Sequence, residues 1–205
     1  MGAQPDPKES LNEDARWIAQ ILTTDSASLQ EECYERLLKK YWRLVSVLAA
    51  SKLGDQREAE DIAQEAFVRA FRSLHKLTKP IAFLGWLVKI ARNLITDHIR
   101  TRRPTFSLDM LRDPGGPGMS VATSTKTPSF EKDLETSEEM EVVLKAMSRL
   151  PEKYREVVVL RYVQGLDGKT MARLLGEPDG TIRNRLFRAL ERLRADIDES
   201  RVRKS

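Results

Sequence analysis

The chain has little of several residue types on which many functional sites depend. Its 205 residues include one cysteine, Cys33, and two histidines, His75 and His98. One cysteine cannot form an internal disulfide, and together with two histidines it offers no credible zinc ligand set. We therefore expect no metal site and no cofactor. Aromatic residues make up only 6% of the chain, so any core is expected to be aliphatic.

Long apolar runs are also missing. No run approaches the roughly 18–20 residues that span a bilayer, and the N-terminal stretch MGAQPDPKES has no apolar segment of the kind found in signal peptides. These absences favour a cytoplasmic protein. Charge, by contrast, is plentiful: Lys and Arg number 35 against 31 Asp and Glu. A net charge of +4 is mild, so the position of the positive charge matters more than its total.

Helical periodicity dominates the first hundred residues. Apolar side chains recur at spacings of three and four, and no strand-like alternation occurs. Ser28 and Glu31 form a capping-box pattern that predicts the start of a long helix ending at Gly54. A second helix is predicted from Asp55 to Leu74, and a third begins at Pro80 and stops before Pro104. Three helices with short connections predict a compact helical unit.

Residues 104–137 have a different character. They contain four prolines and three glycines without any apolar period, which predicts a flexible linker between two domains. The fold class is therefore all-α, with two small helical domains joined by a flexible linker. The predicted limits are a partly disordered N-terminal extension at 1–27, a first domain at 28–103, a second domain at 138–199 and a basic tail at 200–205.

The second domain contains the layout of a helix-turn-helix, MARLLGEPDGTIRNRL. Gly176 permits the left-handed turn, and Asp179 or Thr181 can cap the second helix. That helix carries five arginines against the single acid Glu191 between residues 181 and 194. Arginines beside an apolar stripe can simply be solvated, but one acid cannot neutralise five of them. The arrangement suits phosphates and guanine edges, with Asn184 able to read an adenine edge.

The first domain carries two opposite charge clusters. Residues 55–65 contain five acids and one arginine, a net charge of −4. Residues 89–103 contain five basic residues and one acid, a net charge of +4. An acidic helix face is usually just solvated, whereas a basic face with neighbouring polar residues fits a nucleic-acid strand.

Three segments together resemble a known family. They are DQREAEDIAQEAFVRAFRSL, FLGWLVKIARNLITDHIRTRRP and LPEKYREVVVLRYVQGLDGKTMARLLGEPDGTIRNRLFRALERLR. Their order, spacing and intervening linker are similar to those of bacterial RNA polymerase sigma factors of the extracytoplasmic-function (ECF) type, group 4 of the sigma-70 superfamily. The resemblance covers about residues 28–103 and 138–196. It implies that the two domains are sigma regions 2 and 4.

The resemblance also implies partners and roles. A sigma factor binds core RNA polymerase, directs it to promoters through their −35 and −10 elements, and assists melting without catalytic residues of its own. It would contact the polymerase clamp helices and flap, duplex promoter DNA, the non-template single strand and an anti-sigma factor. By position, the residues implied for the clamp helices are Glu60, Asp61, Gln64 and Glu65. Those implied for the −10 element are Arg92, Asn93, Asp97, His98 and Arg100. Those implied for the −35 element are Thr181, Arg183, Asn184, Arg185 and Arg188.

Two positions depart from the family pattern. The chain has Asp167-Gly168-Lys169-Thr170 where the family often has a serine and two acids, which leaves a flap or local contact there open, and Phe187 where it often has histidine, which leaves the base preference open. An alternative from another class is a free-standing helix-turn-helix regulator that binds duplex DNA as a dimer. Such a regulator would not need the acidic cluster at 55–65 for docking on a polymerase, so charge reversal there distinguishes the two hypotheses.

Overall fold

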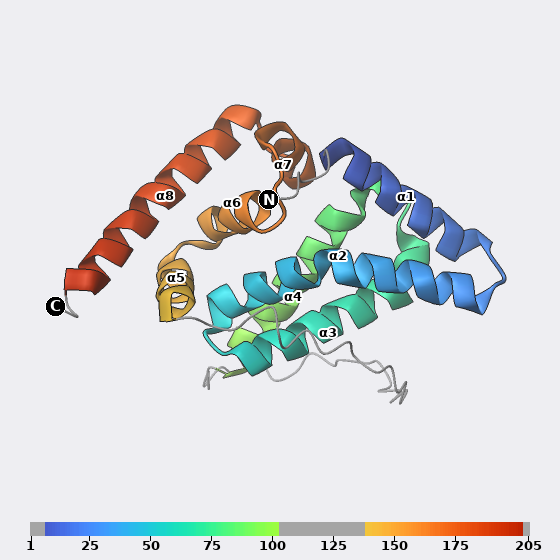
Figure 1. The fold of residues 1–205 in the computed structure, drawn as a ribbon, viewed down its shortest axis with the longest axis horizontal. Coiled ribbons are helices and arrows are strands. Elements are labelled where there is room, and N and C mark those ends of the chain that lie inside the picture. Colours follow the sequence, from blue (N-terminus) through green and yellow to red (C-terminus); the bar gives the residue numbers. More distant parts are fainter. Residues whose placement is uncertain (1–6, 103–137, 203–205) are drawn as a thin grey trace, which may run out of the picture.

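The computed structural model describes residues 7–102 and 138–202. Within these ranges the chain forms eight α-helices and two short 3-10 helices, with no strand. The predicted all-α class is confirmed. Figure 1 shows helices α1–α4 on one side of the molecule and α5–α8 on the other, with α8 along the outer edge. The predicted linker at 104–137 lies outside the described residues.

The first group begins with α1 (Pro7–Thr23) and α2 (Ala27–Leu53), which pack against each other. The predicted cap at Ser28 is wrong. Ser26 is the N-cap: it has an extended backbone, and its side chain accepts a hydrogen bond from the Leu29 amide. Ser28 is therefore already inside the helix. The helix ends at Gly54, whose φ of 73° lies in the left-handed region that favours glycine.

Helix α1 starts at Pro7, inside the N-terminal extension that was expected to be partly disordered. Its inner face explains why it is held. Ile18 and Ile21 are buried, and Asp14 accepts hydrogen bonds from the Lys40 ammonium and the Tyr41 hydroxyl of α2. Burial raises the pKa of the Asp14 carboxyl above its usual range, and the Lys40 and Tyr41 hydrogen bonds oppose that rise. A buried carboxylate needs such partners, so α1 is fastened to α2 by polar as well as apolar contacts.

The rest of this group is α3 (Gln56–Arg72), the 3-10 helices η1 (Leu74–Lys76) and η2 (Pro80–Ala82), and α4 (Phe83–Arg102). Asp55 caps α3 as predicted, accepting from the Glu58 amide at 3.0 Å. Helices α2, α3 and α4 pack pairwise around one core, and α1 covers η2. Tyr41 and Phe83 are fully buried there. This packing leaves Asp61, Gln64 and Glu65 of α3 exposed.

The second group is α5 (Glu138–Arg149), α6 (Glu152–Tyr162), α7 (Gly168–Leu175) and α8 (Asp179–Val202). Asp167 caps α7 by accepting from the Thr170 amide at 2.7 Å. Gly176 ends it with a φ of 67°. Gly176 therefore makes the predicted sharp turn between the two helices of the helix-turn-helix, while Asp167 fixes the start of the first of them. Helix α8 begins at Asp179, so Thr181 lies within its first turn and is not its cap.

A buried arginine holds the turn between α5 and α6. The Arg155 side chain donates hydrogen bonds to the carbonyl oxygens of Met147 at 3.0 Å, Ser148 at 3.3 Å and Leu150 at 2.5 Å. These carbonyls belong to the end of α5 and the turn after it, where backbone acceptors have no helical partner. Burial lowers the pKa of the Arg155 guanidinium. Arg155 therefore fixes the platform on which α8 packs, and it is not a surface residue available to DNA.

Candidate nucleic-acid interface

Helix α8 presents a polar strip to solvent on the side opposite its core contacts. Ile182, Ala189 and Leu193 face inward and are buried. Arg183, Asn184, Phe187 and Arg188 are exposed. A shallow hollow of about 460 Å³ is lined by Asn184, Phe187, Arg188, Glu191 and Arg192. The helix has 24 residues, about 36 Å at 1.5 Å per residue, and its outer face is open along the edge of the molecule (Figure 1).

The five residues predicted for duplex DNA are not equally available. Arg183, Asn184 and Arg188 are exposed, whereas Thr181 and Arg185 are partly buried. Arg185 donates to the Glu177 carboxylate at 2.8 Å, and its side chain is 21% exposed. Arg183 also pairs with Asp179, at 3.1 Å, but its side chain is 74% exposed. An exposed pair exchanges readily with other partners, while Arg185 is tied to the turn that connects α7 to α8.

Phe187 is a residue that the helical stripe alone did not assign to the site. Its side chain is 64% exposed although it lies between Asn184 and Arg188 on the recognition helix. A large apolar ring that remains in solvent on a helix rich in arginine suits contact with an apolar part of a ligand. The signal in the sequence is an aromatic residue off the apolar period, two positions before the buried Ala189.

Helix α4 carries the residues predicted for the −10 element. Asn93, Asp97 and Arg100 are exposed and share one face, since they are spaced by four and three residues. Arg100 lies 3.5 Å from Asp97, and both side chains are more than half exposed. Trp86 is partly buried, packs on the core, and has its ring centroid 6.3 Å from that of Phe83. This face is therefore polar and open at its outer end and aromatic near its start.

The other two residues predicted for this set point elsewhere. The His98 Nε2 lies 3.3 Å from the Glu58 carboxylate of α3, and Arg102 contacts the same carboxylate. Arg92 donates to Glu152 of α6 at 2.6 Å and to Glu156 at 3.5 Å. The structure thus brings Asn93, Asp97 and Arg100 together and turns Arg92 and His98 toward protein acids.

The acidic residues predicted to bind the clamp helices lie on α3. Asp61, Gln64 and Glu65 are exposed, and Glu60 is partly buried, accepting a hydrogen bond from Gln56 at 2.9 Å. Glu65 pairs with Arg69 on the same helix at 2.6 Å. Val68 continues this face and is 41% exposed. The surface therefore combines carboxylates, an amide and one apolar side chain, and its negative charge is complementary to a basic partner surface.

Burial and hydrogen bonding shift the pKa of two further carboxyl groups, both in the α5–α8 group. Burial raises the pKa of the Glu156 carboxyl, although the Arg92 charge opposes the rise. The Thr170 amide that Asp167 caps lowers the pKa of the Asp167 carboxyl. Across the described ranges, no cluster of His, Cys, Asp and Glu is arranged to hold a metal ion, and no helix has the length and apolar character of a membrane span.

The chain matches two family models. The sigma-70 region 2 model matches residues 34–105, and the sigma-70, region 4 model matches residues 140–193. The chain is 31% identical over 169 residues to the ECF RNA polymerase sigma factor SigW of Bacillus subtilis, covering 82% of this chain and 90% of SigW. It is 30% identical over 176 residues to the ECF RNA polymerase sigma-E factor of Escherichia coli K12, covering 84% of this chain and 90% of that relative.

One relative is longer. The chain is 33% identical over 167 residues, 82% of its own length, to the probable RNA polymerase sigma factor RfaY of Xanthomonas campestris pv. campestris, and spans 41% of that protein. Two solved structures share the fold at 20% identity. The complex of CnrH with the cytosolic domain of CnrY gives a TM-score of 0.57 over 91% of this chain and 97% of that one. The sigma factor RpoE with the anti-sigma factor NepR from Bartonella quintana gives 0.53 over 80% and 96%.

Two matched regions, in this order and with a helix-turn-helix in the second, define a sigma factor of bacterial RNA polymerase. The chain belongs to the ECF sigma factors of the sigma-70 family. Members of this family are transcription initiation factors that direct RNA polymerase to promoters, and this chain has that function. The free-standing regulator is not favoured, because such a protein would not carry a sigma-70 region 2.

Proposed function

We propose that α8 reads the −35 element through Arg183, Asn184 and Arg188. The observation that supports this most directly is the exposed strip on α8, where Asn184 and Arg188 line a shallow hollow together with Phe187, and Arg183 is exposed on the same helix. Arginine recognises guanine edges or phosphate, and asparagine pairs with adenine. In this proposal Arg185 acts from the edge of the interface, with Thr181 near the start of the helix. The Arg185 pair with Glu177 holds the helix-turn-helix turn in shape.

The −10 element is assigned to α4 and the preceding segment. Asn93, Asp97 and Arg100 form the exposed face, and Arg92 and His98 lie at its flanks. Holding a melted strand requires contacts that offset the few kcal/mol needed to unstack a base. A basic surface with polar side chains can supply such contacts along the backbone of the strand. Asp97 and Arg100 already pair weakly, so this pair can separate to meet DNA.

Core polymerase is assigned to the acidic face of α3. Asp61, Gln64 and Glu65 stand in a row on the outer side of that helix, with Glu60 at its edge. In this proposal they bind the clamp helices, while the second domain rests on the flap. The domain limits at 28–103 and 138–199 and a linker at 104–137 belong to the same proposal. An anti-sigma factor is a further proposed partner, since the RpoE structure that shares this fold contains one.

The chain is proposed to contribute no catalytic group, because phosphodiester bond formation belongs to the polymerase. Its place of action is then the bacterial cytoplasm, where the polymerase and the chromosome are. Permanganate footprinting of promoter DNA tests these assignments together. With core polymerase and this chain, thymines near the transcription start should become reactive, and the upstream element should be protected from nuclease. Core polymerase alone should do neither. An unmelted, unprotected promoter in the presence of both proteins would contradict the proposal.

A further inference from the structure

Two cations from different helices lie over one aromatic ring at the edge of the hollow on α8. The Lys153 Nζ lies 5.3 Å from the centroid of the Tyr154 ring, and the Arg192 Cζ lies 4.9 Å from the same centroid. Lys153 and Tyr154 belong to the first turn of α6, and Arg192 belongs to α8, which packs on α6. We call Lys153, Tyr154 and Arg192 the ring cluster.

The two positive charges of the ring cluster are not neutralised by acids. Lys153 and Arg192 are exposed, and no carboxylate among the described side chains forms an ion pair with either of them. Arg183 and Arg185 of the same α8 differ, because each pairs with an acid. An anion that approaches Lys153 and Arg192 therefore has no carboxylate to displace.

The Tyr154 ring keeps the two cations in place without cancelling their charge. Tyr154 is 7% exposed, so the core around it fixes its position. A cation over an aromatic face is attracted by the negative face of the ring, and this attraction leaves the net charge available to an anion. Lys and Arg side chains lose rotamer freedom when a ligand immobilises them. Cations that already rest on a ring have less of that freedom to lose.

The ring cluster continues the surface proposed to bind the −35 element. Arg192 lines the hollow together with Asn184 and Arg188, and Glu191 is the one acid in that lining. Arg192 follows Arg188 by four residues, so it lies on the same face about 6 Å further along the helix. In a helix-turn-helix, the N-terminal residues of the recognition helix reach the base edges. One turn beyond Arg188, a side chain is placed to meet the phosphate backbone that borders the groove.

We propose that Lys153 and Arg192, held over Tyr154, bind phosphates of the DNA backbone beside the −35 element. This inference rests on the proposed reading of duplex DNA by α8, and it adds a second helix, α6, to the contact. Phosphate contacts position a protein on the duplex and carry no base preference. The ring cluster thus adds affinity on any duplex, while Asn184 and Arg188 supply the preference for one element.

The salt dependence of DNA binding tests this site. Holoenzyme made from core polymerase and the full chain is bound to a duplex fragment that carries the upstream element without the −10 element. The slope of log K against log salt concentration falls by about 0.9 for each phosphate contact that is lost. Lys153→Gln and Arg192→Gln should each lower the slope by about that amount, and the double variant by about twice as much. The loss of affinity should be the same on a fragment with altered bases.

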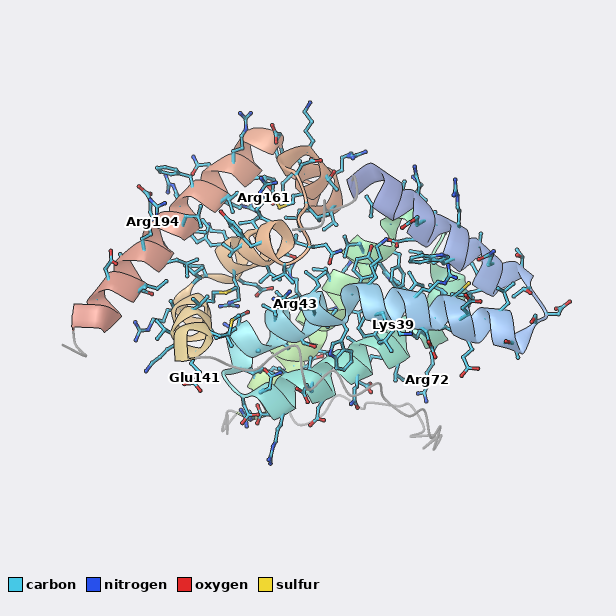
Figure 2. All side chains as sticks on the ribbon, in the orientation of Figure 1. Lys39, Arg43, Arg72, Glu141, Arg161 and Arg194 are labelled. Carbon is cyan, nitrogen blue, oxygen red and sulfur yellow. The ribbon has the colours of Figure 1, made fainter. Side chains whose placement is uncertain are left out.

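Lys145→Gln/Arg194→Gln is the matched control. Lys145 is exposed on α5 and Arg194 on α8 (Figure 2), so this variant removes two exposed charges outside the ring cluster. It should keep the wild-type slope. A Lys153→Gln/Arg192→Gln slope equal to that of the control would overturn the proposal. A loss seen on one DNA sequence alone would also overturn it, because it indicates base reading. Failure to co-purify with core polymerase would indicate a protein partner instead.

Substitutions of Tyr154 test the ring at constant charge. Tyr154→Phe keeps the ring and should bind DNA as the wild type does. Tyr154→Leu should weaken binding about two- to fivefold, the effect of one weak cation–π contact, with the slope unchanged because both cations remain. A thermal melt of each variant shows whether the helices are still folded. Equal affinity of two folded Tyr154 variants would overturn the role of the ring.

The same fragments separate this inference from the proposed function. If wild-type holoenzyme prefers the natural element and Arg188→Ala loses that preference while the ring-cluster variants keep the wild-type slope, only the phosphate site is wrong. If wild-type holoenzyme with active core binds the natural and altered fragments equally, the proposed reading by α8 fails. A slope that still depends on Lys153 and Arg192 on both fragments would then support the phosphate site alone.

Discussion

Arg185 donates a hydrogen bond from its guanidinium to the Glu177 carboxylate at 2.8 Å, across the turn between α7 and α8. Arg188, three residues later on the same helix, is exposed and lines the hollow on the outer face. Two arginines of one recognition helix therefore have different roles. Arg185 fixes the angle at which α8 leaves the turn, and Arg188 is available to DNA.

Arg188→Ala should weaken binding of the holoenzyme to promoter DNA. If Arg188 reads a guanine, the loss should be about 1–3 kcal/mol and specificity should relax at one base pair. If it contacts a phosphate, the salt slope should fall by about one unit. Fluorescence anisotropy at several salt concentrations measures both. Arg194→Ala is the control, since Arg194 is an exposed arginine further along α8 (Figure 2). Equal affinities for the two variants would mean that Arg188 is merely solvated.

Phe187 should contact a thymine methyl group in the upstream element. Replacing each thymine there with deoxyuridine removes only that methyl, so one replacement should weaken binding by the wild-type holoenzyme. The same replacement should have no effect on Phe187→Ala, because the ring that meets the methyl is absent. Binding measured in all four combinations gives the coupling between ring and methyl. Independent effects of the two changes would rule out the contact.

Charge reversal on α3 should abolish binding to core polymerase. In Asp61→Lys/Glu65→Lys, two exposed acids of the docking face become basic. Glu31→Lys/Glu35→Lys is closely matched on α2, because the acids have the same spacing and Glu35 pairs with Lys39 as Glu65 does with Arg69. Co-purification with core polymerase should fail for the first variant alone. Retained binding by the first variant, or loss by both, would place the docking surface elsewhere.

Asp167→Ala should destabilise the region 4 helices by about 1 kcal/mol, the usual effect of losing an N-cap. Asp167→Asn keeps a side-chain oxygen that can accept the hydrogen bond from the Thr170 amide, so this variant should lose much less stability. The pKa of Asp167 is lowered in the folded state by its bond from the Thr170 amide. Its contribution is therefore present above the unfolded value near 3.8 and lost as the pH falls through the lower folded value. Denaturant unfolding at several pH values should show that the stability difference between the wild type and Asp167→Ala shrinks as the pH falls through this range; a difference that does not change with pH would contradict it.

Asp14→Ala should loosen α1 from the rest of region 2. The substitution removes the carboxylate that accepts from the buried Tyr41 hydroxyl and the nearest carboxylate of the Lys40 ammonium, a loss of about 3 kcal/mol by analogy with other broken buried pairs. Glu13→Ala, at a half-exposed position on the same helix, should change stability by about 0.5 kcal/mol or less. Hydrogen exchange of the α1 amides measures the difference. Equal protection in both variants would show that the apolar contacts of α1 suffice.

Local signals in the sequence located most of the helices. Asp55 caps the helix that was predicted to start there, and Gly54 and Gly176 end helices in the left-handed conformation that glycine favours. The error at Ser28 has a local cause, because two serines stand two residues apart and only Ser26 has the extended backbone of a cap. The start of α1 at Pro7 could not be predicted from its polar first turns, since Asp14 and Ile18 are held by residues of α2.

The candidate site was harder to predict than the fold. Exposure of Asn184 and Arg188 follows from the helical period around the buried stripe. The partners of Arg92 and His98 do not, because Glu152 and Glu58 are 60 and 40 residues away in sequence. Charge counts along α4 treat these two residues as free, whereas tertiary contacts pair them with acids. Long-range pairing of this kind is visible only once the helices are placed in space.

The most direct test of the central claim is sequencing of the 5′ ends of transcripts made in vitro. Core polymerase from the bacterium that carries this gene is mixed with sheared genomic DNA, with and without the chain. With the chain, new start sites should appear that share two sequence elements at a fixed spacing, and Asp61→Lys/Glu65→Lys should not produce them. Start sites identical to those of core polymerase alone, with a core shown to be active, would contradict the assignment of this chain as a promoter-directing sigma factor.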